Sequence, residues 1–304
     1  MYYCESNKVI LIDYSQTIIS NLMAEIGGRT DVEIDVNLLR HMVINTIRSH
    51  KVKFGKEYGE VIIACDSRKY WRKEVFPFYK ANRKKAREDS GFNWPLIFDS
   101  INLIKEELRA IFPFKVIEVE GAEADDIIAT LVYWSTCHDL KEGVIFNEDA
   151  AKSLIIISGD HDFNQLQKYK HVKQFSPVQK KFVKPESTPE EYVIEHIIKG
   201  DKGDGVPNVL SADDSIVNGE RQKSIASKKL TEWIKDPSTM PQDETFKRNY
   251  DRNRMLVDLS FIPTSLQNTI INTFTDYPVK DKSQLLNYFI ANRMKQMIEH
   301  IEEF

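Results

Sequence analysis

Three short apolar runs in this sequence each end in an aspartate. The runs are VILID, which ends in Asp13, VIIACD, which ends in Asp66, and LIIISGDHD, which ends in Asp160 and Asp162. Short runs rich in β-branched residues are typical of strands buried on both faces of a parallel sheet. A single aspartate after a strand is commonly a turn or cap residue. Three such strands instead predict one crevice lined by carboxylates, because parallel strands end at the same edge of a sheet.

The first part of the chain alternates between strand and helix patterns. The strand patterns fall at 8–13, 60–65, 115–119, 153–157, 171–176 and 180–184. Amphipathic helix patterns lie between them at 35–52, 96–112 and 123–137. This alternation is typical of an α/β fold with a mostly parallel central sheet flanked by helices, and we expect that fold over residues 1–185.

The rest of the chain, residues 186–304, has mainly helical patterns. Thr188, Pro189 and Glu191 form a strong helix start, and that helix is expected to stop at Gly200. Further helices are expected at 224–234, 244–257, 265–274 and 282–302.

Composition excludes several classes of protein. The chain has 304 residues, of which 41% are hydrophobic, so it can bury a sizeable core. No apolar stretch is long enough for a membrane span, and we expect no signal peptide. The three cysteines are widely spaced, which favours a reduced intracellular protein and provides no zinc-binding spacing. We therefore expect a cytoplasmic protein, monomeric and without a membrane partner.

The segment 68–87 is strongly basic. It contains nine lysine and arginine residues and a single acid, Glu74, although the whole chain has a net charge of only −4. Aromatic residues interleave with the basic ones, and these are Tyr70, Trp71, Phe76, Phe78 and Tyr79. Basic side chains neutralise phosphates and aromatic rings stack on bases, so the segment favours nucleic-acid binding over a merely solvated helix face.

Two further groups of acids complete a set of eight. Glu123 and Asp125 begin the expected helix at 123–137, and Asp201 and Asp204 lie in a glycine-rich turn. Acids at helix starts and in turns are common by themselves. If all eight meet, they need cations, because like charges raise one another's pKa. Oxygen ligands without cysteine or histidine select hard cations, so we expect two Mg²⁺ ions, for which Mn²⁺ can substitute.

Such a metal pair predicts phosphodiester hydrolysis. Two cations about 4 Å apart stabilise an in-line phosphoryl displacement and activate the attacking water, so no Ser-His or Cys-His pair is needed. None of the seven histidines has a metal-ligand spacing, and His161 is expected to be an exposed loop residue.

Four ordered motifs resemble the flap endonuclease or 5′-nuclease family, which includes the 5′→3′ exonuclease domain of bacterial DNA polymerase I. They are DSRKYWRKEVFPFYKANR, AEADD, SGDHDFNQL and KGDKGDGVPNV, and the resemblance covers about residues 8–260. In spacing and length the sequence is most similar to the ribonuclease H branch of T-even bacteriophages. After Gly205 it departs from the Gly-Val-x-Gly-Ile-Gly hairpin that is usual in the family.

The resemblance implies a domain organisation. A PIN-like nuclease core would occupy residues 1–185, with a basic helical arch at about 68–95. A helical DNA-binding region would follow at 186–304, with a helix–three-turn–helix motif at about 188–210.

The resemblance also implies a role for each candidate residue. Around the first metal would lie Asp13, Asp66, Glu123, Asp125 and Asp160, and around the second Asp162, Asp201 and Asp204. Lys80 and Arg83 would contact the scissile phosphate at the base of the arch, and would be catalytic together with the eight acids. The nucleic-acid-binding residues would be Arg72, Tyr79, Lys80, Arg83, Lys84, Lys85, Arg87, Lys199 and Lys202, with Tyr79 stacking on the terminal base.

The implied activity is that of a Mg²⁺-dependent 5′ nuclease with 5′→3′ exonuclease and flap endonuclease activity. It would degrade RNA primers in RNA–DNA hybrids, and adjacent DNA, during phage replication in the host cytoplasm. Its substrates would be forked, flap or nicked DNA and RNA–DNA hybrid. Candidate protein partners are the single-stranded DNA-binding protein and the sliding clamp of a phage replisome.

Two alternatives come from different classes of protein. A phosphatase with an aspartyl nucleophile would need Asp-x-Asp after the first strand, where this sequence has Asp13-Tyr14-Ser15. A non-catalytic protein that binds branched DNA would not need to keep all eight acids.

Overall fold

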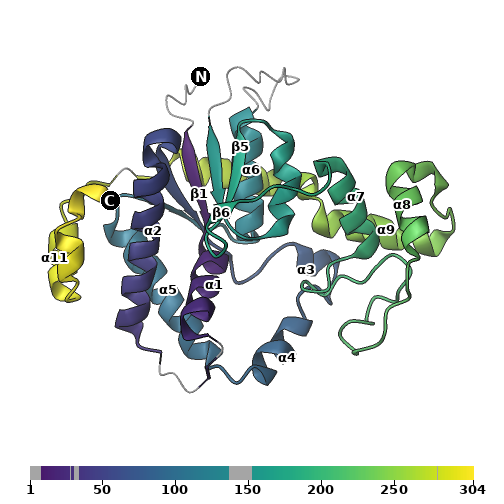
Figure 1. Cartoon of the computed structure of the whole chain (residues 1–304), viewed down its shortest axis with the longest axis horizontal. Helices are drawn as coiled ribbons and strands as arrows, with labels where there is room; N and C mark the ends of the chain where they lie inside the picture. Colours follow the sequence, from purple (N-terminus) through teal and green to yellow (C-terminus); the bar gives the residue numbers. More distant parts are fainter. Residues whose placement is uncertain (1–7, 28, 31–33, 137–152, 279) are drawn as a thin grey trace.

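The sheet is the part of the fold that positions the candidate site. A computed structural model describes residues 8–27, 29–30, 34–136, 153–278 and 280–304, and these form one six-stranded sheet with the order β3-β2-β1-β4-β5-β6 (Figure 1). The strands are β1 (Val9–Asp13), β2 (Glu60–Ala64), β3 (Lys115–Ile117), β4 (Leu154–Ile157), β5 (Val172–Ser176) and β6 (Lys181–Phe182). All neighbouring strands are parallel except β5 and β6, which confirms the predicted mostly parallel sheet.

The strand order reverses between β1 and β4. The chain builds β2 and β3 on one side of β1 and then returns to build β4 and β5 on the other side. In the register of the sheet, Ile12 pairs with Ile63 and with Ile157, so the three strands end almost level. A reversal of this kind leaves a crevice outside the carboxyl ends of the strands, where Asp13, Asp66 and Asp160 begin the loops.

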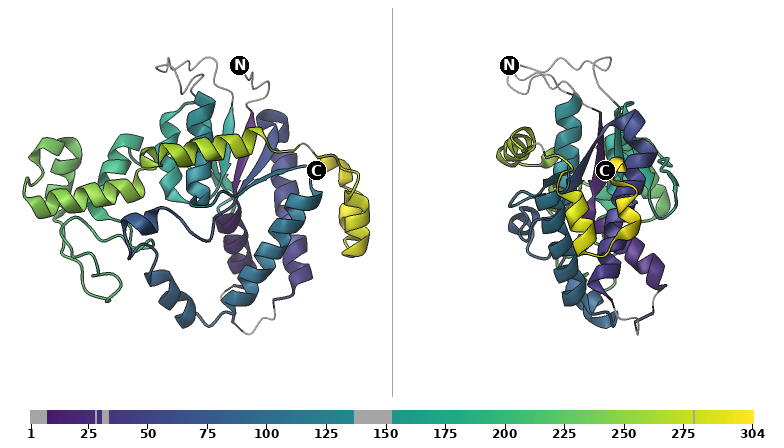
Figure 2. Two further views of the ribbon diagram at one scale, coloured as in Figure 1. Left: turned by 180° about the vertical axis from the view of Figure 1, so that it is seen from behind. Right: turned by 90° about the vertical axis from the view of Figure 1, so that its left-hand side faces the viewer.

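Helices cover both faces of the sheet (Figure 2). The first face packs on α1 (Tyr14–Ile26), α2 (Val36–Tyr58) and α5 (Trp94–Ile111), and the second on α6 (Ala124–Thr136), the 3₁₀ helix η1 (His161–Lys168) and α10 (Thr264–Thr275). Successive side chains of β1 alternate between these two cores. Ile10 and Ile12 join the first, whereas Val9 and Leu11 join the second, so β1 is buried on both faces as its sequence predicts.

The remaining helices lie beside the sheet (Figure 1). The basic segment forms α3 (Arg72–Val75) and α4 (Asn82–Asp89) near the carboxyl ends of the strands, and the C-terminal region forms α7 (Pro189–Lys199), α8 (Ser227–Lys235), α9 (Glu244–Val257), α11 (Leu285–Ala291) and α12 (Lys295–Ile298). Thr188 and Glu191 make the predicted reciprocal capping bonds at the start of α7. Within the described part of the chain, no helix combines the length and apolar character that a membrane crossing requires.

Three features of the fold differ from the sequence-based expectations. Helix α1 was not expected, although Asp13 caps it by accepting a hydrogen bond from the Gln16 N–H (3.1 Å). The prediction of a single helix at 282–302 is wrong, because Arg293 adopts a left-handed φ of 56°. The N–H of Met294 then bonds to the carbonyl of Phe289 (2.8 Å), which ends α11 and turns the chain back toward the core.

The third difference concerns the helix–three-turn–helix motif at 188–210. Its first helix, α7, is present, but residues 200–226 form turns and extended segments, and the next helix is α8. Two asparagines of α9 hold this stretch: Asn253 donates to the carbonyl of Pro207 (2.9 Å) and Asn249 to that of Val209 (2.9 Å). The expected second helix is therefore replaced by turns whose carbonyl groups bond to α9.

Of the three cysteines, Cys65 is a buried core residue. The other two, Cys4 and Cys137, lie outside the described residues. The expected end of the helix at 123–137 lies outside them too.

Candidate active site

Three carboxylates meet where β1, β2 and β4 end. Asp13 is buried, and it accepts hydrogen bonds from the Gln16 N–H and from the Ser158 hydroxyl (3.2 Å). Asp66 accepts from the N–H of Ala124 (2.9 Å), which brings the start of α6 to the end of β2. Asp160 caps η1 by accepting from the Asp162 N–H (3.0 Å). Local capping bonds therefore fix Asp13 and Asp160 at one edge of the sheet, and a bond from the start of α6 fixes Asp66 there.

Burial and mutual repulsion disfavour the charged forms of these acids. Burial, followed by the charges of Asp66 and Asp160, raises the pKa of Asp13 to about 8. Burial, followed by the charges of Asp160 and Asp13, raises the pKa of Asp125 well above its usual range. Burial and Asp162 raise the pKa of Asp160 to about 6. An all-oxygen set of acids that repel one another fits hard divalent cations, which would restore the charged forms.

Glu123 and Asp204 differ from this group because cations of the basic segment already pair with them. Buried Glu123 lies 2.9 Å from Arg72 Nη1 and also pairs with Lys80. Asp204 pairs with Arg83, lies 3.5 Å from Lys80 Nζ, and accepts a hydrogen bond from the Tyr79 hydroxyl (2.8 Å). Burial alone would lower the pKa of Lys80, but Asp204 and Glu123 outweigh it and raise that pKa. The eight acids thus divide into those with protein cations beside them and those without.

Close backbone packing joins the basic segment to the glycine-rich turn. Lys80 has a left-handed φ of 56°, and its N–H bonds to the Asp204 carbonyl (2.7 Å). A Cβ added to Gly205 would lie 2.9 Å from the carbonyl oxygen of Phe78, closer than real side chains approach. The position of Lys80 therefore depends on the turn that carries Asp204.

Two residues expected to contact nucleic acid are instead buried. Arg72 is only 2% exposed, and its guanidinium bonds to Glu123, to Asp126 (2.8 Å) and to the carbonyl of Leu256 (2.8 Å). Tyr79 is 3% exposed, and its ring packs edge-on against that of Tyr70. The expectation that Arg72 faces substrate and that Tyr79 stacks on a base is corrected, because Arg72 satisfies buried carboxylates and the Tyr79 ring is covered.

The other expected nucleic-acid-binding residues remain accessible to solvent at least in part. Arg83, Lys84, Lys85, Lys199 and Lys202 are exposed, and half-buried Arg87 lies over the ring of Phe98. Several of them border a cavity of about 1400 Å³ between α4 and α5, lined also by Asp66, Lys80 and Glu123. This cavity joins the basic helix to the carboxylate edge of the sheet.

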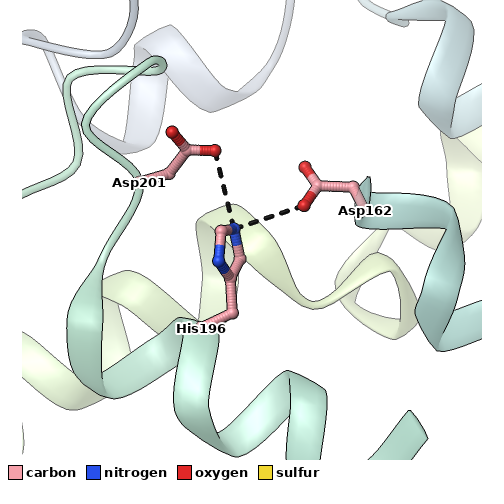
Figure 3. Close-up of side chains that lie close together, drawn as sticks. All are labelled: Asp162, His196 and Asp201. Carbon is pink, nitrogen blue, oxygen red and sulfur yellow. Dashed lines mark ion pairs between the residues drawn. The ribbon is translucent and has the colours of Figure 1, made fainter. Parts of the chain in front are cut away.

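A histidine that the sequence did not single out completes a second cluster (Figure 3). His196 on α7 lies between Asp162 and Asp201, with its Nε2 3.2 Å and 3.5 Å from their carboxylate oxygens. Burial alone would lower the pKa of His196, but the two carboxylates raise it to about 10. Burial opposes ionisation of Asp201, yet His196 holds its pKa below the usual value. The sequence feature that could have identified His196 is its position about one helical turn before the turn at Gly200 and Asp201.

The exposed position of His161, directly beside this cluster, is as expected. It belongs to η1 rather than to a loop.

The sequence matches two family models in succession. The model for the 5′-3′ exonuclease N-terminal resolvase-like domain matches residues 8–196, and that for the T4 RNase H C-terminal domain matches residues 187–304. The chain belongs to the 5′-3′ exonuclease family. This family member is 32% identical to Ribonuclease H of Enterobacteria phage T4 over 97% of its own length and 95% of that protein. It is 25% identical to DNA polymerase I of Bacillus caldotenax over 82% of its length, a match that covers 30% of the polymerase.

Solved structures show the same fold. The T5 D15 protein co-crystallised with metal ions superposes with a TM-score of 0.62 at 18% identity, covering 88% of this chain and 97% of that one. The bacteriophage T5 D15 flap endonuclease in a pseudo-enzyme-product complex with DNA and metal ions gives a TM-score of 0.60 at 16% identity. The predicted family and fold are thus confirmed, and the predicted 5′ nuclease is confirmed at the level of the family. Apart from the corrections at Arg72 and Tyr79, the roles of individual residues stay predictions.

The burial of Arg72 predicts a structural effect of its removal. Arg72→Ala should lower the free energy of unfolding by about 3 kcal/mol or more, because Glu123 and Asp126 are left buried without their cation. Urea unfolding measures this loss, and exposed Lys85→Ala is the control that should leave stability unchanged. Wild-type stability combined with weaker binding of flap DNA would restore the nucleic-acid role of Arg72.

The raised pKa of Asp13 predicts that Asp13→Asn stabilises the metal-free protein, by an amount that depends on pH. Because the folded protein retains a proton on Asp13 that the unfolded chain loses, the metal-free wild type loses stability as pH rises between 3.8 and about 8. In EDTA, Asp13→Asn should therefore be more stable than wild type, by a difference that grows with pH by at most about 1.4 kcal/mol per unit. Urea unfolding across this range measures the difference, with Asp251→Asn on the exposed face of α9 as control. A difference independent of pH would contradict the repulsion among these acids.

Proposed function

We propose that this chain is a Mg²⁺-dependent 5′ nuclease that hydrolyses phosphodiesters by in-line displacement with two cations. The observation that carries the proposal is the crowding of Asp13, Asp125 and Asp160 at the carboxyl edge of the sheet, where burial and repulsion raise the pKa of each. Two divalent cations, when bound there, would supply the positive charge that stabilises the attacking and leaving oxygens of the displacement.

The acids of this chain would divide between the two cations. The residues proposed to hold the first are Asp13, Asp66, Glu123, Asp125 and Asp160, and those proposed for the second are Asp162, Asp201 and Asp204. Glu123 and Asp204 also form ion pairs with the basic segment. Both pair with Lys80 and Asp204 pairs with Arg83, which holds these cations beside the other carboxylates. From there the ammonium of Lys80 would bind the scissile phosphate and stabilise its developing charge.

The proposed substrates are flap, forked or nicked DNA and RNA–DNA hybrids, with RNA primers and adjacent DNA degraded during phage replication. Support comes from the T4 relative, which is named a ribonuclease H, and from the T5 neighbour, which is a flap endonuclease held with DNA. The cavity beside α4, bordered by exposed basic side chains, suits a single strand. Lys199 and Lys202 are exposed on the proposed DNA-binding region at 186–304, where they would contact duplex phosphates. A single-stranded DNA-binding protein and a sliding clamp are the proposed protein partners.

Two labelled substrates test this function directly. A 5′-labelled flap duplex and a 5′-labelled RNA–DNA hybrid are incubated with the purified chain in Mg²⁺ or in EDTA. Short labelled products that form only with Mg²⁺ support the nuclease and show which substrate it prefers. An intact substrate with a clear gel shift would favour the alternative of a non-catalytic protein that binds branched DNA.

The acid cluster predicts a separation of binding from cleavage. Asp125→Asn should abolish cleavage in Mg²⁺ while it preserves or strengthens flap binding, because one carboxylate fewer weakens metal placement but also repels phosphate less. Single-turnover cleavage and gel-shift titration measure the two effects. Asp251→Asn, the same chemical change on the exposed face of α9, should retain activity. Full activity of Asp125→Asn would remove Asp125 from the site.

The pairing of Lys80 predicts that it acts in the chemical step. Lys80→Ala should slow single-turnover cleavage by roughly 100-fold or more with a much smaller change in Kd, because its charge is needed most in the transition state. Exposed Lys84→Ala should show the reverse pattern, with a weaker Kd and a nearly unchanged rate at saturation. A loss confined to Kd in Lys80→Ala would make Lys80 a tether for DNA.

A further inference from the structure

Asp162, His196 and Asp201 converge from three separate segments (Figure 3). Asp162 belongs to η1, His196 to the last turn of α7, and Asp201 to the turn that follows this helix. One potential ligand atom from each residue lies within 4.8 Å of the others, and the His196 Nε2 stands between the two carboxylates.

The spacing of these atoms fits a coordination shell as well as it fits an ion pair. Nε2 is shielded from solvent, yet neither carboxylate meets hydrogen-bond geometry with it, although they lie at 3.2 Å and 3.5 Å. Two ligands bound at about 2.1 Å and at right angles around one metal are themselves about 3.0 Å apart. The observed separations are close to this edge length.

Neighbouring groups hold each of the three side chains in this orientation. The Tyr192 hydroxyl donates to Asp162 (3.2 Å), and the Tyr192 ring stacks on the imidazole of His196 at 5.5 Å between centroids. The N–H of Asp204 donates to one oxygen of Asp201 (3.1 Å) and leaves the other facing His196. Gly200 has a φ of 68°, and a Cβ there would clash with the Val206 carbonyl, so the turn fixes where Asp201 stands. Outer contacts of this kind are what orient metal ligands in proteins.

The carboxylate of Asp204 is engaged elsewhere. It pairs with Arg83, accepts from Tyr79 and faces Lys80, all at the base of the basic segment. Asp204 is proposed as a ligand of the second metal, and the structure also places His196 beside Asp162 and Asp201.

We propose that His196 is a metal ligand and that Asp162, His196 and Asp201 form a mixed nitrogen–oxygen site for a divalent transition metal. This inference rests on the proposed function, because the three residues would form the second of the two cation sites proposed there. Imidazole nitrogen is a softer donor than carboxylate oxygen, so it shifts the preference of the site from Mg²⁺ toward transition metals such as Mn²⁺.

The test is Mn²⁺ binding to the full-length chain, freed of metal with EDTA and then titrated with Mn²⁺ alone. Pulsed electron paramagnetic resonance should show the nitrogen modulation of a directly bound imidazole in wild type. The modulation should vanish in His196→Asn and persist in His161→Asn, which changes an exposed histidine directly before Asp162 in the chain. Calorimetric titration should show that the Mn²⁺ dissociation constant of one site rises by about 10-fold or more in His196→Asn, with a smaller rise for Mg²⁺.

Two results would overturn the assignment. One is Mn²⁺ binding to wild type without nitrogen modulation, which needs no variant and would make His196 a counter-ion of the two aspartates. The other is modulation that persists in His196→Asn. Cleavage of the 5′ flap by wild type in Mg²⁺ is measured separately. Cleavage without nitrogen modulation would contradict only the assignment of His196 as a ligand. Nitrogen modulation without cleavage would support the metal site and contradict the proposed nuclease activity.

Discussion

One buried guanidinium joins the parts of this molecule on which the candidate site depends. Arg72, at the start of the basic segment, bonds to Glu123 and Asp126 at the start of α6 and to the carbonyl of Leu256 at the end of α9. It thus ties together the basic segment, the sheet core and the C-terminal helices. Because two buried carboxylates and one buried charge compensate one another there, none of the three can be lost alone without a large penalty.

The same compensation explains why the eight acids are not equivalent. Glu123 and Asp204 have cations of the basic segment beside them, and Asp162 and Asp201 have His196. These neighbouring groups offset the repulsion locally and fix the basic segment and α7 against the site. Asp13, Asp125 and Asp160 have too little positive charge nearby, so burial and repulsion raise their pKa values. These three uncompensated acids are therefore where an added cation stabilises the fold most.

Local sequence was a good guide wherever a short-range interaction decides the structure. The apolar runs before Asp13, Asp66 and Asp160 form neighbouring parallel strands, and the pattern at Thr188 gives the predicted cap of α7. Local sequence was a poor guide where a contact between residues far apart in the chain decides the structure. The helix predicted at 282–302 is interrupted after Ala291, and the left-handed turn at Arg293 allows Phe304 to pack against Phe289 in the core.

What the sequence determined by itself is the family, the sheet, and the meeting of acids at its carboxyl edge. Hydrophobic periodicity and strand-end aspartates carry that information, because each depends on residues close together in the chain. Only the tertiary structure decided which charges neutralise which. It buries Arg72 and Tyr79 against Glu123 and Asp204, and it brings His196 between Asp162 and Asp201. Apart from His196 and Asp201, those pairings join residues that are 34 to 125 positions apart, so no local pattern encodes them. They follow from the packing of α3, α6 and α7 around the end of the sheet.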